Sequence, residues 1–189
     1  MNAISSLSNL DEIEWVHFEG RIPDVLLAAI PQIKQLIPDA TISIEFEKPD
    51  RIGLNDLIPM ADIGIFSRTY FMHWARHHPL VNQTPLPRFF EGLWHQNREA
   101  TQAIITMGEE GACLGTPLER RGGYVSLGTE KVQVVDATGA GDTFLAGFIW
   151  AHGMRKESMI DSVQFAVKLA TIKVAQEGFD GIWQKLIPL

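Results

Sequence analysis

The stretch WVHFEGRIPDVLLAAIPQIKQLIPDATISIEFE, residues 15–47, decides the fold class of this chain. Its two ends are short apolar runs of strand length, and the segment between them carries apolar residues at helical spacing. Pro23 opens this helix at a position where a missing N–H costs little, and Pro38 follows its end near Leu36. A strand, a helix and a second strand in this order predict a parallel strand pair joined by a crossover helix.

The same alternation of short apolar runs and helix-period stretches continues along the chain. We expect strands at residues 61–67, 102–108 and 131–135, a hairpin from residues 112–115 and 124–126, and helices at residues 54–57, 70–77, 87–98, 140–151 and 159–176. This order predicts an α/β fold with a mostly parallel sheet and helices on both faces. No internal repeat or long linker interrupts it, so we expect one domain over residues 1–189.

The composition fits a globular chain and argues against several classes of function. Of the 189 residues, 46% are hydrophobic and 21% are charged, which suffices for a substantial core. The net charge of −7 makes a broad surface for nucleic acid unlikely, although it allows a single anion pocket. No apolar run reaches the roughly 18 residues of a membrane-spanning helix, so we expect no membrane partner.

The start of the chain and its cysteine content predict the compartment. The first 15 residues, MNAISSLSNLDEIEW, have neither a basic head nor a long apolar stretch, so they do not resemble a secretory signal. The one cysteine, Cys113, excludes an internal disulfide framework and fits a reducing compartment. We therefore expect a cytoplasmic protein in which Cys113 is a small, buried, apolar residue.

The most informative stretch for function is VVDATGAGDTFLAGF, residues 134–148. It places a turn, Gly139–Gly141, directly at the start of a helix and after the strand expected at residues 131–135. Small residues at this point let backbone N–H groups approach a ligand, and the N-terminus of the helix favours an anion. A P-loop needs Lys followed by Ser or Thr after its second glycine, and here Asp142 and Thr143 follow Gly141. Phe144 stands where a dinucleotide-binding fingerprint needs glycine.

Asp142 directly follows this turn and needs a separate explanation. A carboxylate beside an anion-binding turn repels phosphate, so its presence indicates another role. It could accept the proton of a hydroxyl group that attacks a phosphate held by the turn, as in phosphoryl transfer. The alternative is a carboxylate that the helix dipole alone favours at the N-terminus.

Residues 136–144, DATGAGDTF, resemble the signature of the PfkB (ribokinase-like) family of carbohydrate kinases. Four further segments, residues 15–21, 45–49, 105–112 and 178–182, are similar in the same order to the ketohexokinase branch of that family. The similarity runs from about Leu10 to Trp183, nearly the whole chain.

The resemblance implies transfer of the γ-phosphoryl group of ATP to a sugar hydroxyl, for example of a ketose such as fructose. The implied cofactors are ATP and Mg²⁺, often with stimulation by K⁺. Asp142 matches the general base of the family. Gly139, Ala140 and Gly141 match the anion hole, where preorganised N–H donors stabilise the charge that develops during transfer.

The resemblance also implies which residues surround the nucleotide. Thr106, Gly108 and Gly111 match the loop that borders the phosphates and adenine. Ala166 and Ala170 match a wall of the adenine pocket. Asp136 and Thr138 match the segment that holds the monovalent cation. The Asn-x-x-Glu segment that organises Mg²⁺ in the family falls near residues 67–70, which contain no Glu. Arg68 at this point could instead meet a nucleotide phosphate as a charge partner.

Full-length members of the family are longer than this chain, and the part without a counterpart here is N-terminal. That part carries the sugar-binding motif and a small β-sheet lid. The resemblance therefore predicts a C-terminal portion that keeps the ATP half and the base and has an incomplete sheet. A dimer of this portion would form through a contact other than the lid. The alternative function is a truncated, catalytically inactive fragment that binds nucleotide or another protein.

Overall fold

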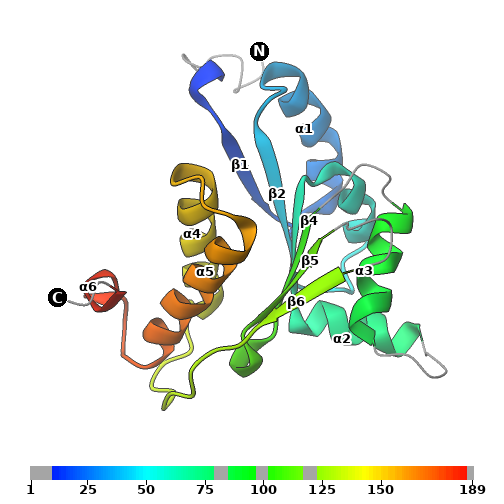
Figure 1. Ribbon diagram of the computed structural model, residues 1–189. Coiled ribbons are helices and arrows are strands. Elements are labelled where there is room, and N and C mark those ends of the chain that lie inside the picture. Colours follow the sequence, from blue (N-terminus) through cyan, green and yellow to red (C-terminus); the bar gives the residue numbers. More distant parts are fainter. Residues whose placement is uncertain (1–9, 79–84, 97–101, 117–122, 187–189) are drawn as a thin grey trace. The chain divides into compact units, whose positions relative to one another are not determined.

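A computed structural model describes residues 10–78, 85–96, 102–116 and 123–186 (Figure 1). Within these ranges six strands form one sheet, and their order in the sheet is their order along the chain. The strands are β1 (Trp15–Glu19), β2 (Thr41–Phe46), β3 (Ile63–Ser67), β4 (Gln102–Thr106), β5 (Ala112–Thr116) and β6 (Gly123–Leu127). The first three strands run parallel, with Trp15 opposite Thr41 and Ser43 opposite Ile63. This matches the parallel pair predicted from residues 15–47.

Helices alternate with the strands as the apolar pattern predicts. The α-helices are α1 (Pro23–Leu36), α2 (Arg68–His77), α3 (Pro85–Gln96), α4 (Ala140–Phe148), α5 (Met159–Val174) and α6 (Ile182–Leu186). Short 3₁₀ helices are η2 (Leu10–Glu12), η3 (Leu54–Met60) and η4 (Gly108–Glu110), and a π-helical segment, η5 (Ile149–Met154), directly continues α4. Pro23 stands in the first turn of α1, and Ser67 caps α2 by accepting a hydrogen bond from the Tyr70 amide at 3.0 Å.

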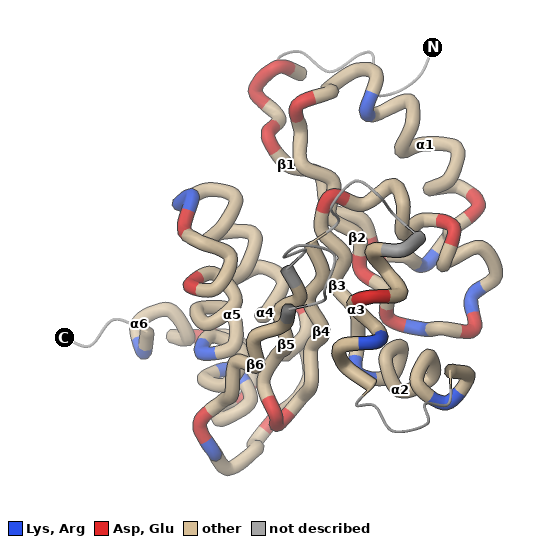
Figure 2. The backbone as a smooth tube through the Cα atoms, turned by 45° about the vertical axis from the view of Figure 1, so that its right-hand side comes forward, with Lys and Arg blue, Asp and Glu red and all other residues tan. Residues whose placement is uncertain are grey.

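The chain folds as two compact units, which we describe separately. The first unit comprises Met1–Ile105 with Gly115–Tyr124, and the second comprises Thr106–Leu114 with Val125–Leu189. Figure 2 shows Lys and Arg residues scattered among Asp and Glu residues along the described chain, without a continuous basic stripe on any element. Over the same residues, no helix combines the length and the apolar character needed to cross a membrane.

Aromatic side chains fill the core of the first unit. The rings of Phe46 on β2 and Phe66 on β3 stack with centroids 4.6 Å apart, and Phe89 of α3 meets Phe66 edge-on at 5.2 Å. All three side chains are buried. Gly115 lies against Phe90, because a Cβ added there would be 2.2 Å from the ring. These contacts explain why the apolar runs of the first unit form buried strands rather than exposed ones.

Helices α4 and α5 pack closely in the second unit. A Cβ added at Gly147 of α4 would lie 3.3 Å from the Ala166 Cα of α5, so a small residue on each helix allows the approach. Ala166 itself has no exposed surface. Cys113, on β5, is 2% exposed, which confirms the prediction that it is a buried residue.

The strand predicted at residues 131–135 is wrong. This segment has no regular secondary structure, and Val134 and Val135 are 62% and 59% exposed. A strand needs a neighbouring strand that pairs with its backbone groups. Here the amides of Val135 and Asp136 instead donate to the Val174 carbonyl at the end of α5, at 2.7 and 3.2 Å. The Gly139–Gly141 turn therefore follows an extended loop, not the end of a buried strand.

Candidate functional site

The N-terminus of α4 begins at Gly139, where only glycine fits. Gly139 adopts a left-handed conformation with φ of 72°. A Cβ added at this position would lie 2.5 Å from Cζ of Phe179. Backbone geometry and local space therefore both require a residue without a side chain.

Among the described residues, two backbone amides in the first turn of α4 have no acceptor. The amide and hydroxyl groups of Thr143 both donate to the Gly139 carbonyl, at 2.9 and 2.8 Å. The Ala140 amide donates to the Ala137 carbonyl. No group in the described part of the chain accepts the amides of Gly141 or Asp142. A Cβ added at Gly141 would have no atom of the described chain within 4 Å. Free amides at a helix N-terminus, with open space beside them, are suited to an anion.

Asp142 is exposed at the second of these amides. It borders a hollow of about 700 Å³ that is entirely part of the second unit. The other walls come from α4, η5, α5, residues 179–181 and α6, and include Ala146, Trp150, Phe179 and Trp183. The carboxylate is therefore accessible to a ligand rather than enclosed in the core.

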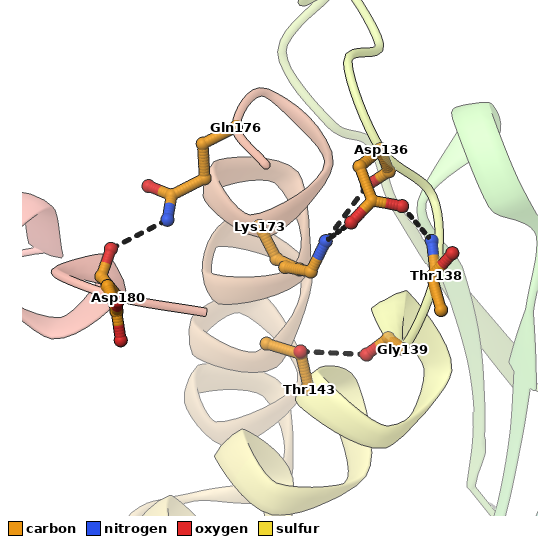
Figure 3. A network of polar contacts seen from close by, with 7 residues as sticks. All are labelled: Asp136, Thr138, Gly139, Thr143, Lys173, Gln176 and Asp180. Atoms are coloured by element: carbon orange, nitrogen blue, oxygen red, sulfur yellow. Dashed lines mark hydrogen bonds and ion pairs between the residues drawn. The ribbon is translucent and has the colours of Figure 1, made fainter. Parts of the chain in front are cut away.

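Asp136 forms a network with the end of α5 (Figure 3). Its Oδ1 accepts a hydrogen bond from the Thr138 amide at 2.9 Å, and its Oδ2 accepts one from Lys173 Nζ at 2.8 Å. Lys173 also donates to the Asp136 carbonyl at 3.0 Å. The hydrogen bond from Lys173, followed by the one from Thr138, holds the pKa of Asp136 far below its usual range.

Lys173 and Phe179 were not singled out by the sequence analysis. Lys173 has no exposed surface, and its Nζ lies 5.0 Å from the centroid of the Phe179 ring. The available signal was helical spacing, because Lys173 follows the buried Ala166 and Leu169 at intervals of seven and four residues on α5. A lysine on that apolar face indicates a buried charge that needs a partner.

Asp136 and Thr138 do not fit the monovalent cation that the family resemblance implies for them. Both carboxylate oxygens of Asp136 already accept hydrogen bonds, and one of the donors is a full positive charge. A second cation at the same carboxylate would be repelled by the Lys173 ammonium.

Magnesium has no preformed cage among the described residues. Within those ranges no three His, Cys, Asp or Glu side chains lie together as a group that could hold a metal ion. Mg²⁺ usually keeps several waters and binds through substrate phosphates and one or two carboxylates. The donor set of this chain is therefore compatible with Mg²⁺ that arrives with a nucleotide.

The loop predicted at the nucleotide is a tight glycine turn. Gly108 and Gly111 have φ of 63° and 86°, and the Met107 amide donates to the Gly111 carbonyl at 2.8 Å. A Cβ at Gly111 would lie 2.0 Å from the Leu127 carbonyl oxygen, whereas one at Gly108 would have no described atom within 4 Å. Gly111 is thus needed for packing, and Gly108 leaves an open backbone surface.

The predicted site residues divide between the two units. Arg68 is exposed at the start of α2 in the first unit. The remaining predicted residues, Thr106, Gly108, Gly111, Asp136, Thr138, Gly139, Ala140, Gly141, Asp142, Ala166 and Ala170, belong to the second unit. Of the two alanines assigned to an adenine pocket, Ala166 is fully buried and Ala170 is half-buried.

Comparisons with known proteins cover nearly the whole chain. A family model described as "pfkB family carbohydrate kinase" matches residues 5–185. Ketohexokinase from Mus musculus is 28% identical over 181 residues, which are 92% of this chain and 57% of the relative. Ribokinase from Dictyostelium discoideum is 35% identical over 116 residues, which are 61% of this chain and 36% of the relative. The chain therefore spans little more than half the length of the ketohexokinase that it matches.

Solved structures share the fold at low sequence identity. Ribokinase from Giardia lamblia has a TM-score of 0.74 and 16% identity, with 95% of this chain and 58% of that chain covered. Arabidopsis thaliana ribokinase, solved with ribose and ATP, has a TM-score of 0.70 and 20% identity, with 95% and 58% covered. These likenesses confirm the predicted ribokinase-like α/β fold.

Proposed function

We propose that this chain, which belongs to the pfkB family of carbohydrate kinases, transfers the γ-phosphoryl group of ATP to a sugar hydroxyl. The acceptor would be a sugar of the kind that its ketohexokinase and ribokinase relatives are named for. The observation that carries the proposal is the exposed carboxylate of Asp142, next to two helix amides without acceptors in the described chain. Both belong to the stretch that carries the family signature.

Asp142 is the general base in this proposal. Its carboxylate accepts the proton of the sugar hydroxyl as the hydroxyl oxygen forms a bond to the γ-phosphorus. The bond between that phosphorus and the bridging oxygen of ADP breaks, and ADP leaves with the electron pair. The accessible position of Asp142 on the hollow of about 700 Å³ is compatible with an incoming alcohol.

The Gly139–Gly141 turn is the anion hole. Amides that are already fixed by the Gly139 cap need no reorganisation when charge develops on the transferred phosphoryl oxygens. Such preorganised donors act most strongly where water is excluded. The side-chain-free face of Gly141 leaves the room that a phosphoryl group needs.

The nucleotide would be held by backbone and charge. The open backbone at Gly108 is the proposed partner of the phosphates, and Ala170 remains a proposed contact of adenine. Mg²⁺, when bound, would neutralise charge on the phosphate oxygens. The residues of this chain then orient the nucleotide and move the hydroxyl proton.

A second candidate function is nucleotide binding without turnover. The chain spans 57% of the mouse ketohexokinase it matches, and this candidate requires no sugar site. Water exclusion at the transfer site also depends on covering elements in kinases of this kind. This candidate keeps the roles of the glycine turns and removes only the acceptor alcohol.

Coupled release of ADP tests the proposal with fructose or ribose as acceptor and Mg²⁺ present. We expect Asp142→Asn to lower turnover about 10²- to 10⁴-fold, the usual contribution of a general base, with ATP affinity changed little. Asp180→Asn is the matched control, because Asp180 borders the same hollow but is not part of the turn. Turnover that survives Asp142→Asn refutes the assignment of the base.

An ATP titration followed by tryptophan fluorescence separates the two candidates. ATP binding with sugar-dependent ADP release supports the kinase. ATP binding without release for any sugar supports the second candidate, and the absence of binding contradicts both.

A further inference from the structure

Lys173 is a buried positive charge that the proposed chemistry does not use. It stands in the last turn of α5 and has no exposed surface. An ammonium group removed from water is strongly unfavourable unless charge and hydrogen bonds compensate it. Its surroundings must therefore provide that compensation.

Three groups surround the ammonium. Asp136 offers both a carboxylate oxygen at 2.8 Å and its backbone carbonyl at 3.0 Å (Figure 3). The ring of Phe179 lies 5.0 Å away, within the range of a cation–π interaction. Carboxylate oxygens, carbonyl oxygens and aromatic faces are also groups that bind monovalent cations. The surroundings of Lys173 thus have the chemistry of a cation site in which a side chain already supplies the charge.

The same groups support the turn before α4. The second oxygen of the Asp136 carboxylate accepts the Thr138 amide, which precedes the helix cap at Gly139. The ring of Phe179 contacts Lys173 and also occupies the space where a side chain at Gly139 would lie. A change at Lys173 would therefore reach the backbone that presents the Gly141 and Asp142 amides.

We propose that the Lys173 ammonium takes the place of a monovalent metal ion at Asp136 and positions the turn at residues 136–139. The chain then needs no K⁺ to order this turn. Lys173 is a positioning residue, because it acts through Asp136 and Phe179 and not on the reacting atoms. The consequence for ATP binding rests on the function proposed above, whereas the consequence for stability does not.

Replacing potassium chloride by tetramethylammonium chloride at constant ionic strength tests this inference. We expect the wild-type chain to show the same melting temperature and the same ATP affinity, within about twofold, in both salts. The Lys173→Met variant keeps the straight side chain but leaves the Asp136 oxygens without a cation. We expect it to melt lower in tetramethylammonium, and K⁺ to raise its melting temperature and tighten ATP binding about tenfold.

Two further variants control the experiment. Lys168→Met removes an exposed lysine from the same helix and should behave as wild type in both salts. Asp136→Asn combined with Lys173→Met removes both charges and should abolish the response to K⁺. If Lys173→Met does not fold, the wild-type comparison and the double variant decide the question.

The inference is wrong if the wild-type chain melts lower without K⁺. It is also wrong if the Lys173→Met variant folds and its melting temperature does not change with K⁺. The melting experiment contains no nucleotide, so its result stands even if the chain neither binds ATP nor turns it over. Failure of ATP binding in both salts, with the expected melting behaviour, refutes the proposed function and leaves this inference supported.

Discussion

Gly139→Ala is expected to destabilise the chain, whereas the same change two residues later is expected to stabilise it. A residue with a Cβ at the φ of 72° costs about 1–2 kcal/mol relative to glycine. The new Cβ would also lie 2.5 Å from Cζ of Phe179, well inside van der Waals contact, so the ring must move. That movement weakens its cation–π contact with Lys173, worth about 0.5–1 kcal/mol. The sum is a loss of about 2 kcal/mol.

Gly141→Ala is the matched control, because this position has helical geometry and an added Cβ would have no neighbour within 4 Å in the described ranges. Alanine in place of glycine in a helix gains about 0.5–1 kcal/mol.

Thermal and urea unfolding of the two variants measures the difference. For a chain of this size, 1 kcal/mol corresponds to about 2–4 °C in melting temperature. We therefore expect Gly139→Ala to melt about 4–8 °C lower and Gly141→Ala to melt about 1–4 °C higher than wild type. Equal free energies of unfolding for the two variants would refute the claim that the cap geometry and Phe179 require glycine only at position 139.

Two predictions concern pH. Burial raises the pKa of Tyr70 to about 12, so its stabilising contribution is complete below pH 10 and is lost between about pH 10 and 12. Two pKa units correspond to about 3 kcal/mol, and urea unfolding should show this alkaline loss in wild type but not in Tyr70→Phe. Burial lowers the pKa of His17, although Glu19 opposes the shift, so stability should fall as pH drops below about 6.5. His17→Gln should flatten that slope; an unchanged slope would contradict the assignment.

Local pattern was sufficient for the elements whose determinants lie within a few residues. Proline at the first turn of the helix, apolar spacing of 3.6 residues and short apolar runs predicted α1 and the strands on either side of it. The signature at residues 136–144 likewise predicted a glycine turn at a helix N-terminus, because glycine is favoured where a residue adopts the left-handed conformation. These features depend on neighbours in sequence, so the amino-acid order alone determined them.

Tertiary structure decided the features whose partners are distant in sequence. Residues 131–135 have the composition of a strand, yet Val135 and Asp136 find their hydrogen-bond acceptor at Val174 and not on a neighbouring strand. The helical spacing of Lys173 indicates a buried charge, but only folding brings this charge to Asp136, 37 positions earlier. A backbone group or a buried charge takes whichever partner the fold brings near, and no local pattern specifies that partner.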